Sequence, residues 1–297
     1  MKNITVVSHI VIDTILSDYK KINSIGGPPS YAGLTAKKLG AEVTLFTKYG
    51  KDLSNDYLAW FTQNQIKIPN DSLSITHPTT RFHIERTMES RNLQLAAKCE
   101  DIQNIGDNIK GNAAIVSPVA GEVSSTILSK LRNKFGMIYL DPQGFIRKFQ
   151  PNGECFHDKI DKEVLKYADI LKMDPEEAYY TTGNRDPFKS LEETFESGIK
   201  VSIYTRGSQG ILLRCNRGLF KIPVSKSVKI LDVTGVGDIF AGAFTMAYLQ
   251  DKDPVWAGSV AAASSSIHLD RLGVQKIPDI KDITNIAKDI FERTERL

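Results

Sequence analysis

Short runs of apolar, often β-branched residues alternate along the chain with stretches whose apolar residues recur at helical spacing. Six of the runs predict strands, namely Ile4–Ser8, Glu42–Thr47, Ala113–Ser117, Gly136–Asp141, Asp169–Leu171 and Lys200–Thr205. Four of the stretches between them predict helices, namely Tyr31–Leu39, Glu122–Lys134, Pro175–Thr181 and Pro187–Glu196. The alternation predicts an α/β fold with a mostly parallel sheet and helices on both faces. In such sheets, ligands bind beyond the carboxyl ends of the strands.

Two segments depart from this alternation. Asp13–Ile25 and Thr79–Leu95 alternate loosely between apolar and polar residues, which is typical of short antiparallel strands with one solvent-exposed face. No internal repeat, low-complexity tract or linker interrupts the chain. We therefore expect one main domain over residues 1–297, with these strands, at about residues 13–25 and 79–98, inserted in it.

Composition changes this picture little. Hydrophobic residues make up 41% of the 297 positions and charged residues 25%, which is ordinary for a globular protein. The 38 basic and 35 acidic residues are spread along the chain and nearly cancel, so nucleic acid and membranes are not expected as partners. The three cysteines are far apart, which argues against a disulfide framework or a zinc site. We expect a cytoplasmic protein.

Candidate chemistry is concentrated in the segment Asp232-Val233-Thr234-Gly235-Val236-Gly237-Asp238. Two glycines separated by one residue allow a sharp turn that directs successive N–H groups into one space. If a helix begins at this turn, its unpaired N–H groups and the positive end of its dipole make a binding site for an anion. A carboxylate there suits proton abstraction from a hydroxyl beside a phosphate. The alternative is that Asp238 only caps the helix.

This segment and the Phe-Ala-Gly-Ala-Phe sequence at 240–244 resemble the C-terminal signature of the ribokinase-like (PfkB) family of carbohydrate kinases. The resemblance implies a three-layer α/β/α fold with a mostly parallel central sheet and a small β lid. It also implies that the strands at about 13–25 and 79–98 form this lid, which closes over the sugar. An edge hairpin without a gating role is the alternative.

The resemblance assigns roles to the glycine-rich segment. Asp238 would be the catalytic base, and the backbone N–H groups of Gly235, Val236 and Gly237 would form the anion hole for the transferred phosphoryl group. Asp232 would help to bind a monovalent cation.

A second motif, Gly26-Gly27-Pro28-Pro29-Ser30-Tyr31, follows the first expected lid strand. The resemblance implies that Asp13, Gly26 and Gly27 bind the substrate hydroxyls, whereas a plain loop leading into a helix is the alternative. Tyr31 stands where ribokinase has Asn, which puts ribose in doubt and adds an aromatic wall. This residue, with Leu-Asp-Pro-Gln-Gly-Phe at 140–145, is similar to the archaeal and plant myo-inositol kinase branch, although both features would also suit packing.

A further motif, at Asp174–Glu177, resembles a part of the family's site for Mg²⁺ and nucleotide. Asp174 and Glu177 stand where the family has Asn-x-x-Glu, a motif tied to Mg²⁺ and phosphate, and either carboxylate suits Mg²⁺ through a water. A capped helix start is the alternative for Asp174.

Two further segments resemble parts of the family's nucleotide site. Thr205, Arg206, Gly207 and Gly210 resemble the turn that lies against the ATP phosphates, with a solvent-facing Arg206 as the alternative. The small residues at 261–266 stand where the family packs a helix beside adenine, although they also suit close helix packing.

The resemblance thus implies an ATP-dependent, cytoplasmic kinase that transfers phosphate to a hydroxyl of a sugar or polyol, with myo-inositol as one candidate. Its cofactors would be ATP, Mg²⁺ and a monovalent cation, and it would be a monomer or a homodimer formed through the lid. The chain lacks a Gly-x-x-x-x-Gly-Lys-Ser/Thr loop, which excludes a P-loop enzyme. A nucleoside kinase that stacks its substrate on Tyr31, and a sugar- or nucleotide-binding relative without turnover, are the alternatives.

Overall fold

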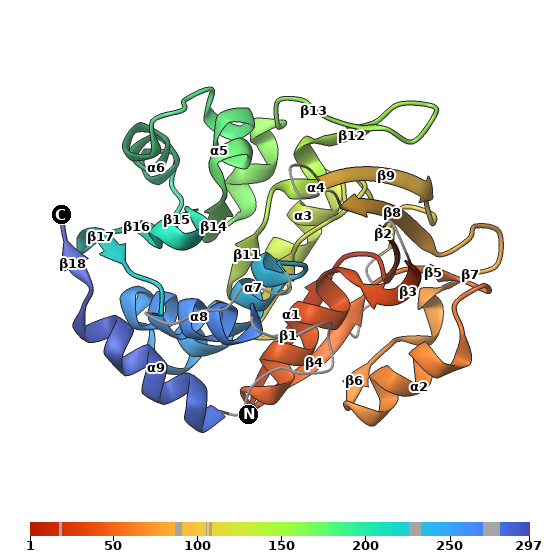
Figure 1. The fold of residues 1–297 in the computed structure, drawn as a ribbon, viewed down its shortest axis with the longest axis horizontal. Helices are drawn as coiled ribbons and strands as arrows, with labels where there is room; N and C mark the ends of the chain where they lie inside the picture. Colours follow the sequence, from red (N-terminus) through yellow and green to blue (C-terminus); the bar gives the residue numbers. More distant parts are fainter. Residues whose placement is uncertain (18–19, 87–90, 105, 107–108, 226–232, 270–279) are drawn as a thin grey trace.

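The computed structural model describes residues 1–297 except 18–19, 87–90, 105, 107–108, 226–232 and 270–279 (Figure 1). Within these described residues, the central sheet has ten strands in the order β18-β17-β16-β15-β14-β11-β10-β1-β4-β6. The strands from β15 to β6 are parallel, and β16, β17 and β18 extend the sheet antiparallel. The expected mostly parallel sheet is confirmed.

The strands of the central sheet are β1 (Lys2–Val7), β4 (Ala41–Phe46), β6 (Ile66–Lys67), β10 (Ala113–Val116), β11 (Ile138–Leu140), β14 (Ile170–Met173), β15 (Val201–Thr205), β16 (Ile211–Cys215), β17 (Gly218–Ile222) and β18 (Glu295–Arg296). Successive side chains of a central strand lie on opposite faces of the sheet and belong to different buried clusters. Val6 and Ile115 lie in one buried cluster, whereas Val7 and Val116 lie in another. A strand covered on both faces needs apolar residues at successive positions, which explains the continuous apolar runs in the sequence.

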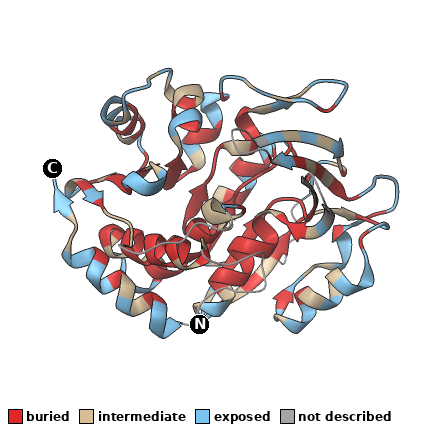
Figure 2. Cartoon of the chain, in the orientation of Figure 1, coloured by how far each residue is buried: buried red, intermediate tan, exposed pale blue. Residues whose placement is uncertain are grey.

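The helices are α1 (Gly27–Lys38), α2 (Asn55–Gln63), α3 (Ser125–Arg132), α4 (Gln143–Ile146), α5 (Pro175–Thr182), α6 (Pro187–Glu196), α7 (Val236–Asp251), α8 (Pro254–His268) and α9 (Ile280–Glu292). Residues of α1, α7, α8 and α9 belong to the first buried cluster, and residues of α3, α5 and α6 belong to the second. Helices therefore cover both faces of the sheet, which gives three layers. Helices α1, α7 and α8 are buried along most of their length (Figure 2).

Helix starts differ from the sequence expectations for local reasons. Helix α1 begins at Gly27, because Pro28 and Pro29 occupy its first turn, where a missing N–H costs nothing. Helix α3 begins after Ser124, whose hydroxyl accepts a hydrogen bond from the third N–H of the helix. Glu122, expected inside this helix, instead accepts hydrogen bonds from N–H groups of its own loop.

A second, four-stranded sheet has the order β3-β2-β8-β9. Its strands are β2 (Val11–Ser17), β3 (Lys20–Gly26), β8 (Thr80–Arg86) and β9 (Arg91–Ala97). The pairs β2–β3 and β8–β9 are antiparallel, as expected, but β2 and β8 join them in parallel. We call these four strands the small sheet. Its buried residues Val11, Phe82 and Ile84 pack with Val119 and Ala120, which belong to the main body.

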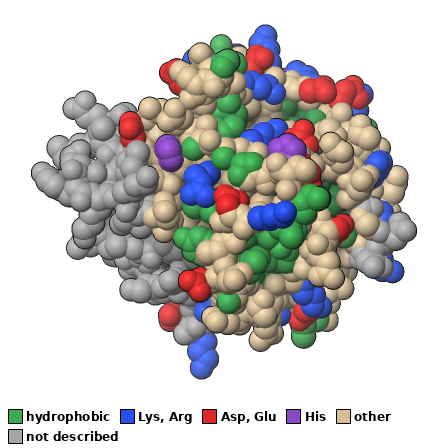
Figure 3. All heavy atoms as spheres, turned by 90° about the vertical axis from the view of Figure 1, so that its right-hand side faces the viewer, with side chains coloured by type: hydrophobic (Ala, Val, Ile, Leu, Met, Phe, Trp, Pro, Cys, Tyr) green, Lys and Arg blue, Asp and Glu red, His purple; other side chains and the backbone are tan. Residues whose placement is uncertain are grey.

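The remaining short strands are β5 (Tyr49–Gly50), β7 (Leu73–Ser74), β12 (Arg147–Phe149) and β13 (Cys155–His157). Basic and acidic side chains are interspersed on the face shown in Figure 3, in keeping with the balanced composition. Over the described residues, no helix is long and apolar enough to cross a membrane. Cys99, Cys155 and Cys215 are free thiols.

Candidate active site

A cavity of about 200 Å³ lies between the small sheet, the carboxyl ends of β11 and β14, and the start of α7. This position agrees with the rule that open α/β sheets bind ligands beyond the carboxyl ends of their strands. The lining residues that bear on the chemistry are Asp13, Gly27, Tyr31, Asp141, Gln143, Arg147, Lys172, Asp174, Glu177, Gly235, Val236, Gly237 and Asp238. Most of the expected substrate, phosphoryl and metal residues therefore line one cavity, but Gly26 does not line it.

The turn that precedes α7 depends on Gly235. This residue has φ +74° and precedes the helix as its N-cap, a conformation that favours glycine. A Cβ at this position would also overlap the ring of Tyr31. Helical hydrogen bonding starts from the N–H of Ile239 to the oxygen of Gly235, at 2.8 Å. The N–H groups of the preceding turn lie at the positive end of the helix dipole, where anions bind.

Asp238 lies in the first turn of α7 and lines the cavity. Its carboxylate forms no hydrogen bond or ion pair with the part of the chain that the structure describes, so the alternative of a helix cap receives no support. The pKa of Asp238 is raised to about 7, first by burial and then by the negative charge of Asp141, while Lys172 and Arg147 oppose the rise. A carboxylate with such a pKa is matched to proton transfer near neutral pH.

Asp13 approaches the cavity from β2 of the small sheet and is buried. A Cβ on Gly26 would overlap the Asp13 carboxylate, so the glycine at this position leaves room for the acid. The next residue, Gly27, has φ +75° and packs against Val11. Glycine is thus required at position 26 to leave room for the Asp13 carboxylate and at position 27 for its positive φ. Asp13 and Asp238 line the same cavity.

Tyr31 is only 2% exposed, although it contributes to the cavity lining. Its ring packs against Gly235 and meets the ring of His268 edge to face, with centroids 5.8 Å apart. Most of the ring is therefore covered by protein, and little aromatic surface is left for a substrate to stack on.

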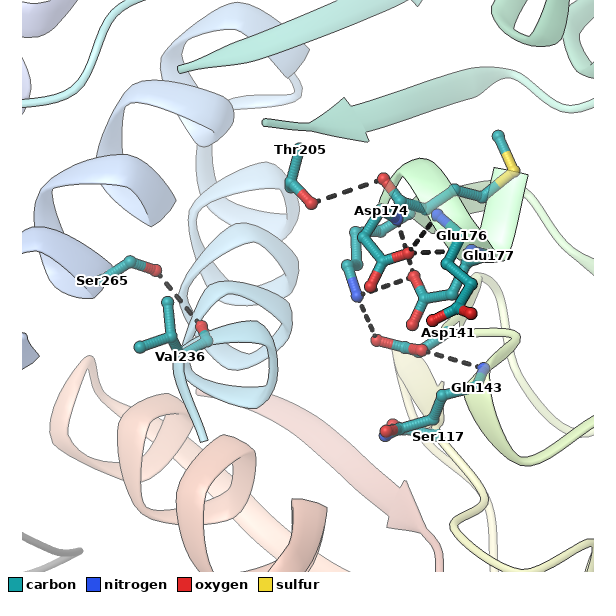
Figure 4. A network of polar contacts seen from close by, with 11 residues as sticks. Ser117, Asp141, Gln143, Asp174, Glu176, Glu177, Thr205, Val236 and Ser265 are labelled. Carbon is teal, nitrogen blue, oxygen red and sulfur yellow. Dashed lines mark hydrogen bonds and ion pairs between the residues drawn. The ribbon is translucent and has the colours of Figure 1, made fainter. Parts of the chain in front are cut away.

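A buried polar network joins β11, β14 and α5 (Figure 4). The ammonium of Lys172 lies 2.9 Å from Oδ2 of Asp141 and 3.1 Å from Oε2 of Glu177. Its Nζ is also 3.5 Å from the position that a Cβ on Gly237 would take. Lys172 therefore lies beside the glycine-rich turn as well as between two acids.

Burial and charge act in opposite directions on this network. Burial lowers the pKa of Lys172, but Asp141 and Glu177 outweigh it and raise the value well above its ordinary range. Burial raises the pKa of Glu177 to about 8, although the charge of Lys172 opposes the rise. The lysine is thus held as a cation, which matters beside a site suited to anions.

Asp174 is the N-cap of α5, which agrees with the alternative prediction of a capped helix start. Its Oδ1 accepts hydrogen bonds from the N–H groups of Glu176 and Glu177, at 2.9 and 2.8 Å. Oε2 of Glu177 in turn accepts the N–H of Asp174 at 2.7 Å, which completes a capping box. Both residues still line the cavity.

The residues expected to contact nucleotide lie in an adjoining groove. Thr205 ends β15, and its hydroxyl donates to the oxygen of Met173 at 3.4 Å. Thr205, Arg206 and Gly207 line a groove with Asp174. Arg206 donates to the oxygen of Gln209 at 3.2 Å.

Gly210 closes the turn with φ +82° and does not line the groove. Asp232, expected to help bind a monovalent cation, lies outside the described residues.

Lys172 and Arg147 line the cavity without having been assigned a role from the sequence. Lys172 is a lysine within the apolar strand Ile170–Met173, and a charge inside a buried strand is the signal that would have found it. Arg147 follows the Asp-Pro-Gln motif and lines the cavity. No sequence pattern singles it out.

The start of α7, the carboxylate of Asp238 and the buried cation Lys172 meet at one cavity, an arrangement that suits a phosphotransferase with a hydroxyl group as acceptor. Residues 1–281 match the family described as pfkB family carbohydrate kinase, and the chain belongs to this family. The expected ribokinase-like fold is thereby confirmed.

Similar proteins have related activities. A cytidine kinase from Thermococcus kodakarensis is 24% identical over 266 residues, covering 85% of this chain and 90% of the relative. A pyrophosphate-dependent kinase of the ribokinase family, solved with a pyrophosphate analog and myo-inositol, superposes with a TM-score of 0.81 at 22% identity, covering 95% of this chain and 99% of that chain. Arabidopsis thaliana ribokinase, solved with ribose and ATP, superposes with a TM-score of 0.77 at 17% identity, covering 97% and 99%.

Proposed function

We propose that this protein transfers the γ-phosphoryl group of ATP to a hydroxyl of a single-ring polyol or sugar, with myo-inositol as the first acceptor to test. The observation that carries the proposal is that Asp238, with its pKa raised to about 7, lines the same cavity as Asp13. One acid is suited to accepting a proton, and the other is suited to accepting hydrogen bonds from neighbouring hydroxyls.

The transfer is a direct in-line displacement. The acceptor oxygen forms a bond to the γ-phosphorus, the bond to the bridging oxygen of ADP breaks, and the acceptor proton passes to Asp238. Asp13, with Gly26 and Gly27 beside it, orients the acceptor. The N–H groups of Gly235 and Gly237 meet the charge of the transferred group, whereas the N–H of Val236, the third expected donor, lies 3.5 Å from the oxygen of Val233 and would have to leave it to take part. Positioning and charge stabilisation supply most of the catalysis in such reactions.

Lys172 is assigned to the phosphoryl side. Its ammonium lies 2.9 Å from Asp141 and near Gly237, so it adds positive charge beside the proposed anion hole. Apolar residues of the small sheet, Val11, Phe82 and Ile84, cover the acceptor side. We propose that this sheet acts as a lid that excludes water, the competing phosphoryl acceptor.

Among the described residues, no group of three acids, histidines or cysteines forms a direct metal site. Oε2 of Glu177 is already engaged by Lys172 and by the N–H of Asp174, so Asp174 and Glu177 would hold Mg²⁺ through water, as this ion often prefers. When bound, the ion would neutralise charge on the ATP phosphates. The residues of the turn after β15, Thr205, Arg206 and Gly207, line the groove that the phosphates would enter.

The covered ring of Tyr31 favours a single-ring acceptor over a nucleoside, because it removes the stacking surface on which the nucleoside alternative depended. The myo-inositol in a solved relative points the same way.

Transfer assays with the purified chain and Mg²⁺ test the proposal. ATP and pyrophosphate serve as donors, myo-inositol, ribose, fructose and cytidine serve as acceptors, and phosphorylated products are detected by ³¹P NMR. We expect an acceptor-dependent phosphate monoester from ATP and a polyol. Preferential transfer to cytidine would favour the nucleoside kinase, transfer from pyrophosphate alone would overturn the donor, and binding without transfer would favour a non-catalytic protein.

A further inference from the structure

Helix α8 contacts the backbone of the proposed anion hole at two points. Nε2 of His268 lies 3.0 Å from the backbone oxygen of Thr234. The hydroxyl of Ser265 donates to the oxygen of Val236 at 3.3 Å, a contact drawn in Figure 4. Because a carbonyl oxygen only accepts, Nε2 of His268 carries the proton in this contact. Residues three apart share one face of a helix, so both side chains reach the turn from α8.

These two carbonyls belong to the peptide units that contain the glycine N–H groups. The oxygen of Thr234 shares a planar unit with the N–H of Gly235, and the oxygen of Val236 shares one with the N–H of Gly237. In a trans peptide the C=O and N–H bonds point in opposite directions, and none of the described peptide bonds is cis. A hydrogen bond that fixes each oxygen therefore also fixes the direction of the following N–H group.

Tyr31 completes the support from α1. Its ring fills the space in which Gly235 would carry a side chain and contacts His268 edge to face, at an interplanar angle of 75°. The turn is thus enclosed between α1 and α8. His268 is fully buried and Ser265 is 8% exposed, so these contacts are shielded from competition by water.

We propose that His268 and Ser265 are positioning residues that aim the N–H groups of Gly235 and Gly237 at the transferred phosphoryl group. The inference rests on the proposed function. Donors fixed in advance stabilise the charge that develops in the transition state more than they stabilise bound substrate. Loss of the α8 contacts should therefore lower kcat and leave KM largely unchanged.

The test compares His268→Leu, which removes the donor, with His268→Gln, which returns an N–H donor to a similar position. Removal of a direct anion-hole donor lowers kcat by about 10²- to 10³-fold, so a misdirected donor should lower it by about 10- to 100-fold. We expect this loss in His268→Leu, recovery of most of it in His268→Gln, and KM for ATP and acceptor within about threefold of wild type, since little uniform binding is lost. Equal loss in both variants, or a raised KM at unchanged kcat, would overturn the proposal.

Two serine-to-alanine variants on α8 test the second contact, and this test holds whether or not the histidine variants fold. Ser259 lies on the same helix, but its hydroxyl donates to the oxygen of Val255 in α8 itself, at 3.0 Å. We expect Ser265→Ala to lower kcat by about two- to tenfold, in keeping with the loss of one neutral hydrogen bond, and Ser259→Ala to leave it unchanged. Equal effects in the two variants would contradict the positioning role.

Amide hydrogen exchange separates this proposal from the proposed function. Wild-type turnover is measured first, and its absence counts against the proposed function alone. Whether or not turnover occurs, the amide of Ile239, which donates to the oxygen of Gly235 in the turn, should exchange faster in Ser265→Ala and His268→Leu than in Ser259→Ala, because opening of the turn breaks this hydrogen bond and governs its exchange. Unchanged exchange at Ile239 would overturn the proposed support of the turn by α8.

Discussion

The two acids that line the cavity, Asp238 and Asp13, are held by very different parts of the molecule. Asp238 lies in the first turn of α7, a helix buried in the main core and contacted by α1 and α8. Asp13 lies on the small sheet, whose buried residues form a separate cluster with Val119 and Ala120. The core of the fold therefore supports the proposed chemistry, while a smaller and separate unit supports the proposed choice of acceptor. Substitution of Asp238 should therefore mainly change kcat, and substitution of Asp13 should mainly change KM for the acceptor.

The largest expected effect comes from Asp238→Asn, which removes the proposed base and keeps the shape of the side chain. We expect kcat to fall by at least about 10²-fold, the lower bound for general base catalysis, with KM for the acceptor little changed. Steady-state kinetics with ATP and myo-inositol measure both. Asp251→Asn, at the exposed end of the same helix, is the control and should behave as wild type. Near-normal turnover in Asp238→Asn would disprove the assignment.

Asp13→Asn should affect binding of the acceptor. Loss of hydrogen bonds to a charged acceptor, worth about 1.5 to 3 kcal/mol, predicts a rise of about 10- to 100-fold in KM for the acceptor, and a smaller change in KM for ATP. Titration of myo-inositol at saturating ATP, and the reverse, separate the two constants. The exposed residue Asp56 provides the control, Asp56→Asn. Equal changes in both KM values would show that the two sides are not separable.

The charges around Asp238 predict two opposite shifts in pH dependence. Asp141 raises the pKa of Asp238 and Lys172 lowers it. The acid limb of kcat/KM should therefore move to lower pH in Asp141→Asn and to higher pH in Lys172→Met, each in addition to a loss of rate. Lys166→Met, at an exposed lysine paired with Glu163, should leave the limb in place. Shifts in the same direction for both cavity variants would contradict the assigned electrostatics.

The smallest expected effect concerns stability. Because the pKa of Asp238 in the folded protein, about 7, is above its ordinary value, the acid favours the folded state when protonated. This contribution is complete at pH values below the ordinary carboxyl range and is lost as pH rises through 7. Asp238→Asn should therefore raise Tm relative to wild type at pH 8 more than at pH 5. Thermal unfolding at both pH values measures the difference, and an equal change at both would count against the raised pKa.

The sequence was most informative where function depends on contiguous residues. The strands, the turn at Gly235 and the position of Asp238 at the start of a helix could be predicted, because local periodicity and backbone requirements determine them. The contact of Tyr31 with Gly235, of Lys172 with Asp141 and Glu177, and of His268 with Thr234 could not. Each joins elements that are distant in the chain, and one sequence carries no record of which side chains meet across a core. For the same reason, the sequence alone does not decide whether Tyr31 forms an aromatic wall of the substrate site or packs against other residues.

The most direct test of the central claim is the pH dependence of kcat/KM for myo-inositol phosphorylation, compared between wild type and Asp238→Asn. The account predicts an acid limb near pH 7 in wild type, where Asp238 loses its proton, and no such limb in the residual activity of the variant. Titration of ATP itself would act equally on both enzymes and is thereby controlled. An unchanged acid limb in Asp238→Asn would contradict the assignment of Asp238 as the base.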